Sequence, residues 1–230
     1  MRKVAVRGLL ARRLRLLLTS MAIALGVMLI TGSYVFTDTF TRSLDKVFVA
    51  ANQGIDVSIT PHQEFRTQDQ AQLPPIDASV ADQVREIDGV RAVEGGVFDA
   101  GATFIGEDGE PVAALSGAPQ FVGSISEVEQ FEAFDYVQGR QPGSDNEIAI
   151  DKALADNENL EIGDMLGVQA RLARQDYRVV GIVQLGGVDS FGGASIALMT
   201  LNEAQRITGK QGKFDGISVA AEPGVQPEEL

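Results

Sequence analysis

Cysteine is absent from the 230-residue chain, and histidine occurs once, as His62. Without cysteine the chain has no disulfide, no thiolate metal ligand, no thiol nucleophile and no residue to carry the acyl group of a lipoprotein. A serine hydrolase needs a base close to its nucleophile. The stretch most similar to a nucleophile motif, Gly193-Ala194-Ser195-Ile196-Ala197, ends in alanine instead of glycine, and His62 lies in a polar stretch. We therefore interpret His62 as a solvated loop residue and predict no catalytic residue.

Motifs for nucleotide and metal binding are also missing. No G-x-x-x-x-G-K-[ST] segment occurs, so the glycine pairs at 186–187 and 192–193 are interpreted as a flexible loop rather than a phosphate cradle. Asp156, Glu158 and Glu161 could suggest a calcium loop, but Glu161 stands where that loop needs glycine. A charged helix surface explains them better. We expect neither a cofactor nor a bound metal.

Acidic residues outnumber basic ones, except at the start of the chain. There are 19 Lys and Arg against 32 Asp and Glu, which gives a formal net charge of -13. So acidic a chain lacks the basic footprint that phosphates require, and we expect no nucleic-acid partner. The residues before position 16 include no acidic one, and their basic members are Arg2, Lys3, Arg7, Arg12, Arg13 and Arg15.

One uncharged, apolar run, residues 16–36, is long enough to cross a bilayer. As a helix it would measure roughly 31 Å, close to the hydrocarbon thickness of about 30 Å. Because basic residues precede it, we expect the N-terminus to stay in the cytoplasm and the rest to lie outside after a single crossing. A cleaved signal peptide is the alternative, although its apolar core is usually about 7–15 residues long and Thr31-Gly32-Ser33 is a weak cleavage site.

Apolar residues recur at helical spacing after the span, while charged residues fall mostly on other faces. The apolar positions are Phe36, Phe40, Leu44, Val47, Phe48 and Ala51. We therefore expect the membrane helix to continue outward as an amphipathic stalk over residues 37–51. Its apolar stripe could contact a partner helix or dock on the soluble domain.

Residues 52–230 mix strands and short helices without regular alternation, which predicts an α+β domain. Alternating and apolar runs predict strands at 55–59, 147–150, 177–183, 195–200 and 217–220. Helical patterns predict a two-turn helix capped by Asp77 or Ser79, helices at 152–159 and 201–208, and a helical turn within 127–134. Turns at 107–110 and 163–164 predict two hairpins, and residues 62–75 are expected to be a connector.

Four segments of the outer part, in this order and spacing, resemble the MacB/FtsX-like family of ABC transporter permeases. These landmark segments are Gly139-Arg140-Gln141-Pro142, Glu147-Ile148-Ala149-Ile150-Asp151-Lys152, Ile162-Gly163-Asp164 and Tyr177-Arg178-Val179-Val180-Gly181-Ile182. The basic amphipathic start at residues 4–11, the single span, and the later Met199-Thr200-Leu201 and Asp215-Gly216-Ile217-Ser218-Val219 resemble the family too. The landmark segments make local sense as turns and a buried strand, so we interpret them as fold-forming rather than as a ligand site.

The resemblance implies four parts: a basic cytoplasmic segment 1–15, a transmembrane helix 16–36, the stalk 37–51 and a MacB-like extracytoplasmic core domain 52–230. The core domain has room for two subdomains, and its likeness to the family is loosest over 90–135. The implied function is that of a catalytically inert plasma-membrane protein, which couples a separate cytoplasmic ABC ATPase to export or mechanical work outside the membrane. Its implied partners are that ATPase, other permease membrane helices or a second permease copy, and membrane lipid.

Such permeases continue into further membrane helices, whereas this sequence ends at Glu228-Glu229-Leu230. We therefore expect a truncated or split permease, or a fragment of a longer chain. Two alternatives stay open: a single-span binding or sensor protein acting alone, and a secreted enzyme behind a cleaved signal peptide. The substrate cannot be inferred, because lipid, peptide and drug carriers could share this scaffold.

Overall fold

The computed structural model describes residues 2–61, 74–112, 117–189 and 193–226. They divide into two compact units, Met1–Asp45 and Lys46–Leu230. His62 and nearly all of the predicted connector at 62–75 lie outside the described residues.

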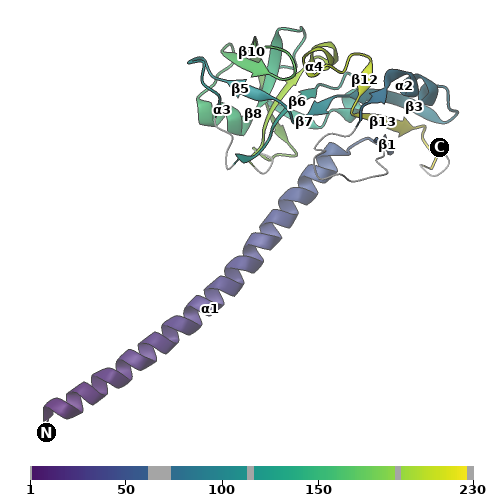
Figure 1. Cartoon of the computed structure of the whole chain (residues 1–230). Coiled ribbons are helices and arrows are strands. Elements are labelled where there is room, and N and C mark those ends of the chain that lie inside the picture. Colours follow the sequence, from purple (N-terminus) through teal and green to yellow (C-terminus); the bar gives the residue numbers. More distant parts are fainter. Residues whose placement is uncertain (1, 62–73, 113–116, 190–192, 227–230) are drawn as a thin grey trace. The chain divides into compact units, whose positions relative to one another are not determined.

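The first unit consists of one helix, α1, which runs from Arg2 to Ala51 and so continues into the second unit (Figure 1). Within the described chain, its stretch Leu17–Val35 is the one helical segment long and apolar enough to cross a membrane. Every side chain in that stretch is exposed. A helix satisfies its backbone hydrogen bonds internally, so a helix with an exposed apolar surface is suited to contact with lipid. The expected continuation of this helix through residues 37–51 agrees with the bounds of α1.

A small lobe forms one end of the second unit (Figure 1). Its elements are β1 (Val57–Ile59), β2 (Ile76–Asp77), α2 (Ala78–Arg85), β3 (Val90–Gly96), β12 (Lys213–Phe214) and β13 (Gly216–Ala221). The antiparallel sheet β1-β13-β3 has β13 at its centre, and β12 pairs with β2. The first and last described strands of the second unit are therefore neighbours in one sheet. Asp77 caps α2 by accepting a hydrogen bond from Ser79 N at 3.0 Å, one of the two caps expected.

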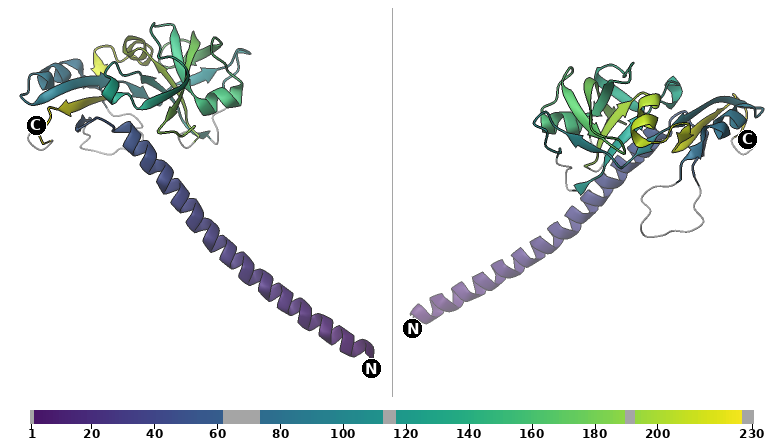
Figure 2. Two further views of the ribbon diagram at one scale, coloured as in Figure 1. Left: turned by 180° about the vertical axis from the view of Figure 1, so that it is seen from behind. Right: turned by 45° about the horizontal axis from the view of Figure 1, so that its top comes forward.

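A large lobe is built on an eight-stranded sheet that also belongs to the second unit. Its elements are β4 (Phe98–Asp99), β5 (Thr103–Ile105), β6 (Gln120–Ser124), η2 (Glu129–Phe131), β7 (Phe134–Gly139), β8 (Glu147–Asp151), α3 (Lys152–Glu158), β9 (Met165–Gln169), β10 (Gln175–Leu185), β11 (Ser195–Met199) and α4 (Leu201–Thr208). The strand order is β4-β6-β11-β8-β10-β9-β5. β10 pairs with β8 in parallel and antiparallel with β9 along its first half and β7 along its second. The two further views in Figure 2 show the two lobes side by side in the second unit.

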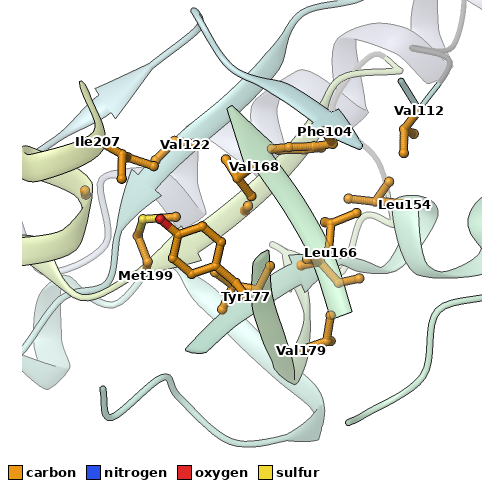
Figure 3. Packing of buried hydrophobic residues seen from close by; sticks show 14 of the residues in the cluster. Phe104, Val112, Val122, Leu154, Leu166, Val168, Tyr177, Val179, Met199 and Ile207 are labelled. Carbon is orange, nitrogen blue, oxygen red and sulfur yellow. The ribbon is translucent and has the colours of Figure 1, made fainter. Parts of the chain in front are cut away.

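Each lobe has its own apolar core. The larger core packs α3 and α4 against one face of the large sheet, and Figure 3 shows Phe104, Leu166, Tyr177 and Met199 among its members. A second cluster, which includes Val183, Ile196 and Leu198, lies on the opposite face. The small lobe buries Ala81, Val93, Phe214, Ile217 and Val219. Leu201 packs against both the larger core and the small-lobe core, so the cores meet at the start of α4.

The predicted α+β class is confirmed, and most differences concern long-range pairing. β5 pairs with β9, which was not expected. The hairpin expected between residues 101–106 and 111–117 is present at its closed end, where Ile105 bridges to Pro111 and Val112 N donates to Phe104 O at 2.9 Å, and residues 113–116 lie outside the described residues. The turn itself forms, with Gly106 N donating to Glu110 O at 2.9 Å. The expected second hairpin is present as β9 and β10. Gly186 and Gly187 make a tight turn between Leu185 and Val188, and residues 190–192 lie outside the described residues.

Candidate functional site

The first and last landmark segments are distant in the sequence, and they meet where β7 pairs with β10. Gly139 lies opposite Gly181 in the antiparallel pair. Gly139 has φ +74°, and a Cβ there would lie 2.1 Å from Val180 O. A Cβ on Gly181 would lie 2.5 Å from Arg140 O. Both positions therefore need glycine, because any side chain would push these two strands apart.

Arg140 and Glu147 tie the start of the first landmark segment to the start of the second. Arg140 donates from both terminal nitrogens to the two carboxylate oxygens of Glu147, at 2.8 and 2.6 Å. Gly143 N donates to the same carboxylate at 2.9 Å. These hydrogen bonds stabilise the ionised form, so they lower the pKa of Glu147 to about 2. The pair closes the loop between β7 and β8.

Asp151 ends β8 and joins three elements. It caps α3 by accepting from Leu154 N at 3.0 Å, and its other oxygen accepts from Ile196 N in β11 at 2.6 Å. Its side chain is buried, and this loss of solvent raises its pKa to about 6 despite the hydrogen bonds. Asp151 therefore fixes where α3 begins relative to the large sheet.

The remaining landmark segment, Ile162-Gly163-Asp164, also joins β10. Gly163 N donates to Val179 O at 2.8 Å, and Val179 N donates to Asp164 O at 2.9 Å. The Asp164 carboxylate accepts from Glu161 N at 2.7 Å, which closes the turn before β9. The landmark segments thus gather around β10 through backbone contacts and side-chain caps.

The end of α1 connects closely to both lobes through residues of the second unit. Asp56 N donates to Val219 O at 2.9 Å, and the Asp56 carboxylate accepts from Ala221 N at 2.8 Å. Gly54 has φ +75°, and a Cβ there would lie 2.3 Å from the carbonyl oxygen of Gln130 beside η2. Within five residues after Ala51, the last residue of α1, the chain is therefore hydrogen-bonded to the small lobe and in close contact with the large one.

Of the residues considered for chemistry, only Asp156 and Glu161 are brought together among the described residues, since both line one hollow. Ser195 is buried in β11, and His62 lies outside the described residues. Asp156 and Glu158 lie on α3 and Glu161 follows it. Within the described ranges, no group of three or more His, Asp or Glu side chains could hold a metal ion.

An open hollow of about 570 Å³ lies beside the C-terminal end of α3. The residues around it include no serine, threonine, histidine or lysine, and they are Gln138, Ala155, Asp156, Asn159, Leu160, Glu161, Ile162 and Ile182. The lining combines the carboxylates of Asp156 and Glu161 with four apolar side chains, and it contains no hydroxyl, imidazole or amine group.

Two of these contacts were not predicted from the sequence. Gly54 was not singled out, since nothing near it in the sequence reveals that Gln130 lies against it. Asp56 lies within the range 55–59 that was expected to be a strand, and its bond to Ala221 spans 165 positions. The local signal for Gly54 was its place just after the helix, where a left-handed residue is common.

The comparisons with known proteins agree with this architecture. The sequence profile of the family described as MacB-like periplasmic core domain matches residues 16–230. No curated protein matches the chain. Among solved structures, the periplasmic region of MacB from Actinobacillus actinomycetemcomitans aligns with a TM-score of 0.52 and 14% identity, covering 76% of this chain and 79% of that one.

Two further structures are similar at lower scores. A domain of a putative permease from Porphyromonas gingivalis has a TM-score of 0.47 and 17% identity, covering 68% of this chain and 73% of its own. The extracellular domain of the noncanonic ABC-type transporter YknZ from Gram-positive bacteria has a TM-score of 0.48 and 17% identity, covering 73% and 85%. The profile match extends from the apolar stretch of α1 to the end of the sequence, and by it the chain belongs to the MacB-like periplasmic core domain family of ABC transporter permeases.

Proposed function

We propose that this chain is the membrane-anchored, extracytoplasmic part of an ABC transporter permease, with residues 1–15 in the cytoplasm. It would couple a separate cytoplasmic ATPase to export or mechanical work outside the membrane. The chain itself would carry no catalytic residue, cofactor or metal.

The observation that carries this proposal is the continuity of α1. The helix runs from the basic segment through the apolar stretch to Ala51 without interruption. A continuous hydrogen-bonded helix moves as a stiff rod, whereas a glycine-rich linker would absorb a displacement. Because Gly54 and Asp56 follow at once with close contacts to the lobes, a displacement of the helix would reach the folded domain.

Charge supports the direction of insertion. The six basic residues before position 16 stand on one side of the apolar stretch, and all 32 acidic residues stand on the other. Basic flanks are retained in the cytoplasm. The predicted result is an N-terminus inside and the lobes outside.

Cysteine accessibility tests the orientation, and the absence of native cysteine gives it a clean background. Ser58 and Ser144 are exposed positions in the small and large lobes. We expect Ser58→Cys and Ser144→Cys to react with a membrane-impermeant thiol reagent on intact cells. A cysteine at Leu10 is the matched control and should react only after lysis. The reverse pattern would contradict the proposed orientation.

Photo-crosslinking in the native host tests the ATPase partner. A photoreactive amino acid at Leu10 should give an adduct whose mass and peptides identify an ABC ATPase subunit, because only residues 1–15 would face the cytoplasm. The same amino acid at Ser58 should give no such adduct. If none of positions 4–11 yields an ATPase adduct while the protein is correctly inserted, the coupling role is wrong.

A further inference from the structure

A buried lysine lies where the small and large lobes meet. Lys210 follows α4 directly after Gly209 and is only 6% exposed. Its ammonium group lies 2.6 Å from the Asp99 carboxylate and donates to both oxygens of Asp215, each at 2.8 Å. Asp99 belongs to β4 of the large lobe, whereas Asp215 stands between β12 and β13 of the small lobe. One cation therefore joins carboxylates from both lobes.

The backbone at the junction depends on the same carboxylates. Phe98 N donates to the Asp215 carboxylate at 2.9 Å, and Asp215 N donates to Gly96 O at 2.8 Å. Gly101 N donates to the Asp99 carboxylate at 2.7 Å. The chain passes from the small to the large lobe between Gly96 and Phe98, and it returns between Lys210 and Lys213. The ion cluster thus bridges the two chain crossings.

Because the cluster is buried, its stability depends on the relative position of the three charged groups. A charge removed from water is tolerated when an opposite charge and hydrogen bonds compensate for its lost hydration. If the lobes turned relative to each other, Lys210 would separate from Asp99 or from Asp215 and leave a buried charge without compensation. Other polar contacts between the lobes run from Ser126 and Glu127 to the Glu94 carboxylate and from Gln205 Nε2 to Lys213 O, and they lie nearer the solvent, where such bonds contribute less.

We propose that Lys210, Asp99 and Asp215 form an electrostatic clamp that holds the two lobes in one relative position, while each lobe keeps its own core. The clamp does not require an ATPase or a substrate. It would allow the lobes to move as one body with the end of α1. Breaking it would release one lobe from the other without unfolding either.

Distances between spin labels test the clamp in the full chain, purified in detergent. The exposed residues Gln83 on α2 and Asn157 on α3 are replaced by cysteine and labelled, one in each lobe. A second pair, Asn157 and Asn202, reports within the large lobe. We expect a narrow distribution for both pairs in the otherwise native chain. In Lys210→Met the Gln83–Asn157 distribution should lose its single narrow peak, while the Asn157–Asn202 distribution should not change.

Lys213→Met is the matched control, because Lys213 is three positions away and exposed. Both distributions should stay narrow in this variant. An unchanged Gln83–Asn157 distribution in Lys210→Met would overturn the proposal. Failure of the proposed function would not affect these distances, so the two hypotheses are tested separately.

A neutral triple variant covers the case in which Lys210→Met unfolds because two carboxylates are left facing each other. Asp99→Asn, Lys210→Gln and Asp215→Asn together keep an acceptor for Gly101 N and Phe98 N but remove all three charges. Loss of the narrow Gln83–Asn157 peak, with the Asn157–Asn202 distribution unchanged, would support the clamp. A native distribution would overturn it, and so would broadening of both pairs, because the cluster would then be needed for the cores themselves.

Discussion

Single residues in the antiparallel pair of β7 and β10 set how closely the two strands approach. Gly139 and Gly187 have nearly the same φ, +74° and +71°, but only Gly139 has backbone atoms where a Cβ would stand. We expect Gly139→Ala to lower the free energy of unfolding by about 3 kcal/mol, from backbone strain and overpacking together. Gly187→Ala should cost about 1 kcal/mol, from strain alone. Urea titrations followed by circular dichroism compare them, and equal losses would show that the close approach to Val180 does not matter.

Two carboxylates of β8 should give opposite pH dependences of stability. The pKa of Glu147 is lowered from 4.5 to about 2 by hydrogen bonds from Arg140, so its contribution is present above 4.5 and lost as the pH falls through 2. Burial raises the pKa of Asp151 from 3.8 to about 6, so its contribution is present below 3.8 and lost as the pH rises through 6.

Substitution of each carboxylate by its amide should therefore flatten a different part of the stability profile. We expect Glu147→Gln to remove part of the decline in unfolding free energy below about pH 4.5, and Asp151→Asn to remove part of the decline between about pH 4 and 6. Urea unfolding at a series of pH values measures both, and each variant is the control for the other. If both variants flatten the same window, the assigned causes are wrong.

Among the secondary-structure elements, those with complete local signals were predicted well. The expected helix at 201–208 matches α4, because Thr200 caps its start and Gly209 ends it in the left-handed conformation. The strand expected at 147–150 and the helix expected at 152–159 agree with β8 and α3 to within a residue. The landmark segments were correctly expected to form turns and a central strand, although their mutual contacts around β10 were not foreseen.

Elements that exist through distant partners were missed. The two-residue strand β12 is defined by pairing with β2, more than 130 positions earlier. Lys210 illustrates the same limit for the candidate sites, because a lone lysine in a polar stretch is expected to be exposed. Only the approach of Asp99 and Asp215 explains its burial. Sequence periodicity indicates which face of a helix or strand a residue occupies, but it does not indicate which distant residue packs against that face.

The stalk is the element on which the proposed coupling depends, and its stiffness can be tested. A pair of glycines inserted between Ser43 and Leu44 costs about 1 kcal/mol of helix propensity per residue and weakens α1 at that point. An inserted pair of alanines is the matched control, because it shifts the helix by the same two residues but keeps its propensity. In the complete permease at equal membrane abundance, we expect the glycine variant to lose more transport than the alanine variant. Equal transport would indicate a passive tether.

For the whole molecule, the location of the cores predicts that residues 52–230 fold without the membrane. Among the residues that the structure describes, the members of the three apolar cores all lie at or after Val57, and the side chains of Leu17–Val35 are exposed. Expressed alone, this part should unfold in one cooperative thermal transition that EDTA does not shift, and it should not hydrolyse ATP. Circular dichroism and a phosphate-release assay are the measurements. A metal-dependent transition or nucleotide turnover would contradict the prediction.

The hydrogen bond between Asp56 and Ala221 places the entry and exit of the folded domain side by side. A segment with adjacent ends behaves as an inserted module, because the backbone on either side follows the same path whether the module is present, exchanged or enlarged. Evolution could therefore splice a different domain between these two positions without rebuilding the helix that precedes them. Among related chains, the outer domain would then vary in structure while the helix that precedes it stayed the same.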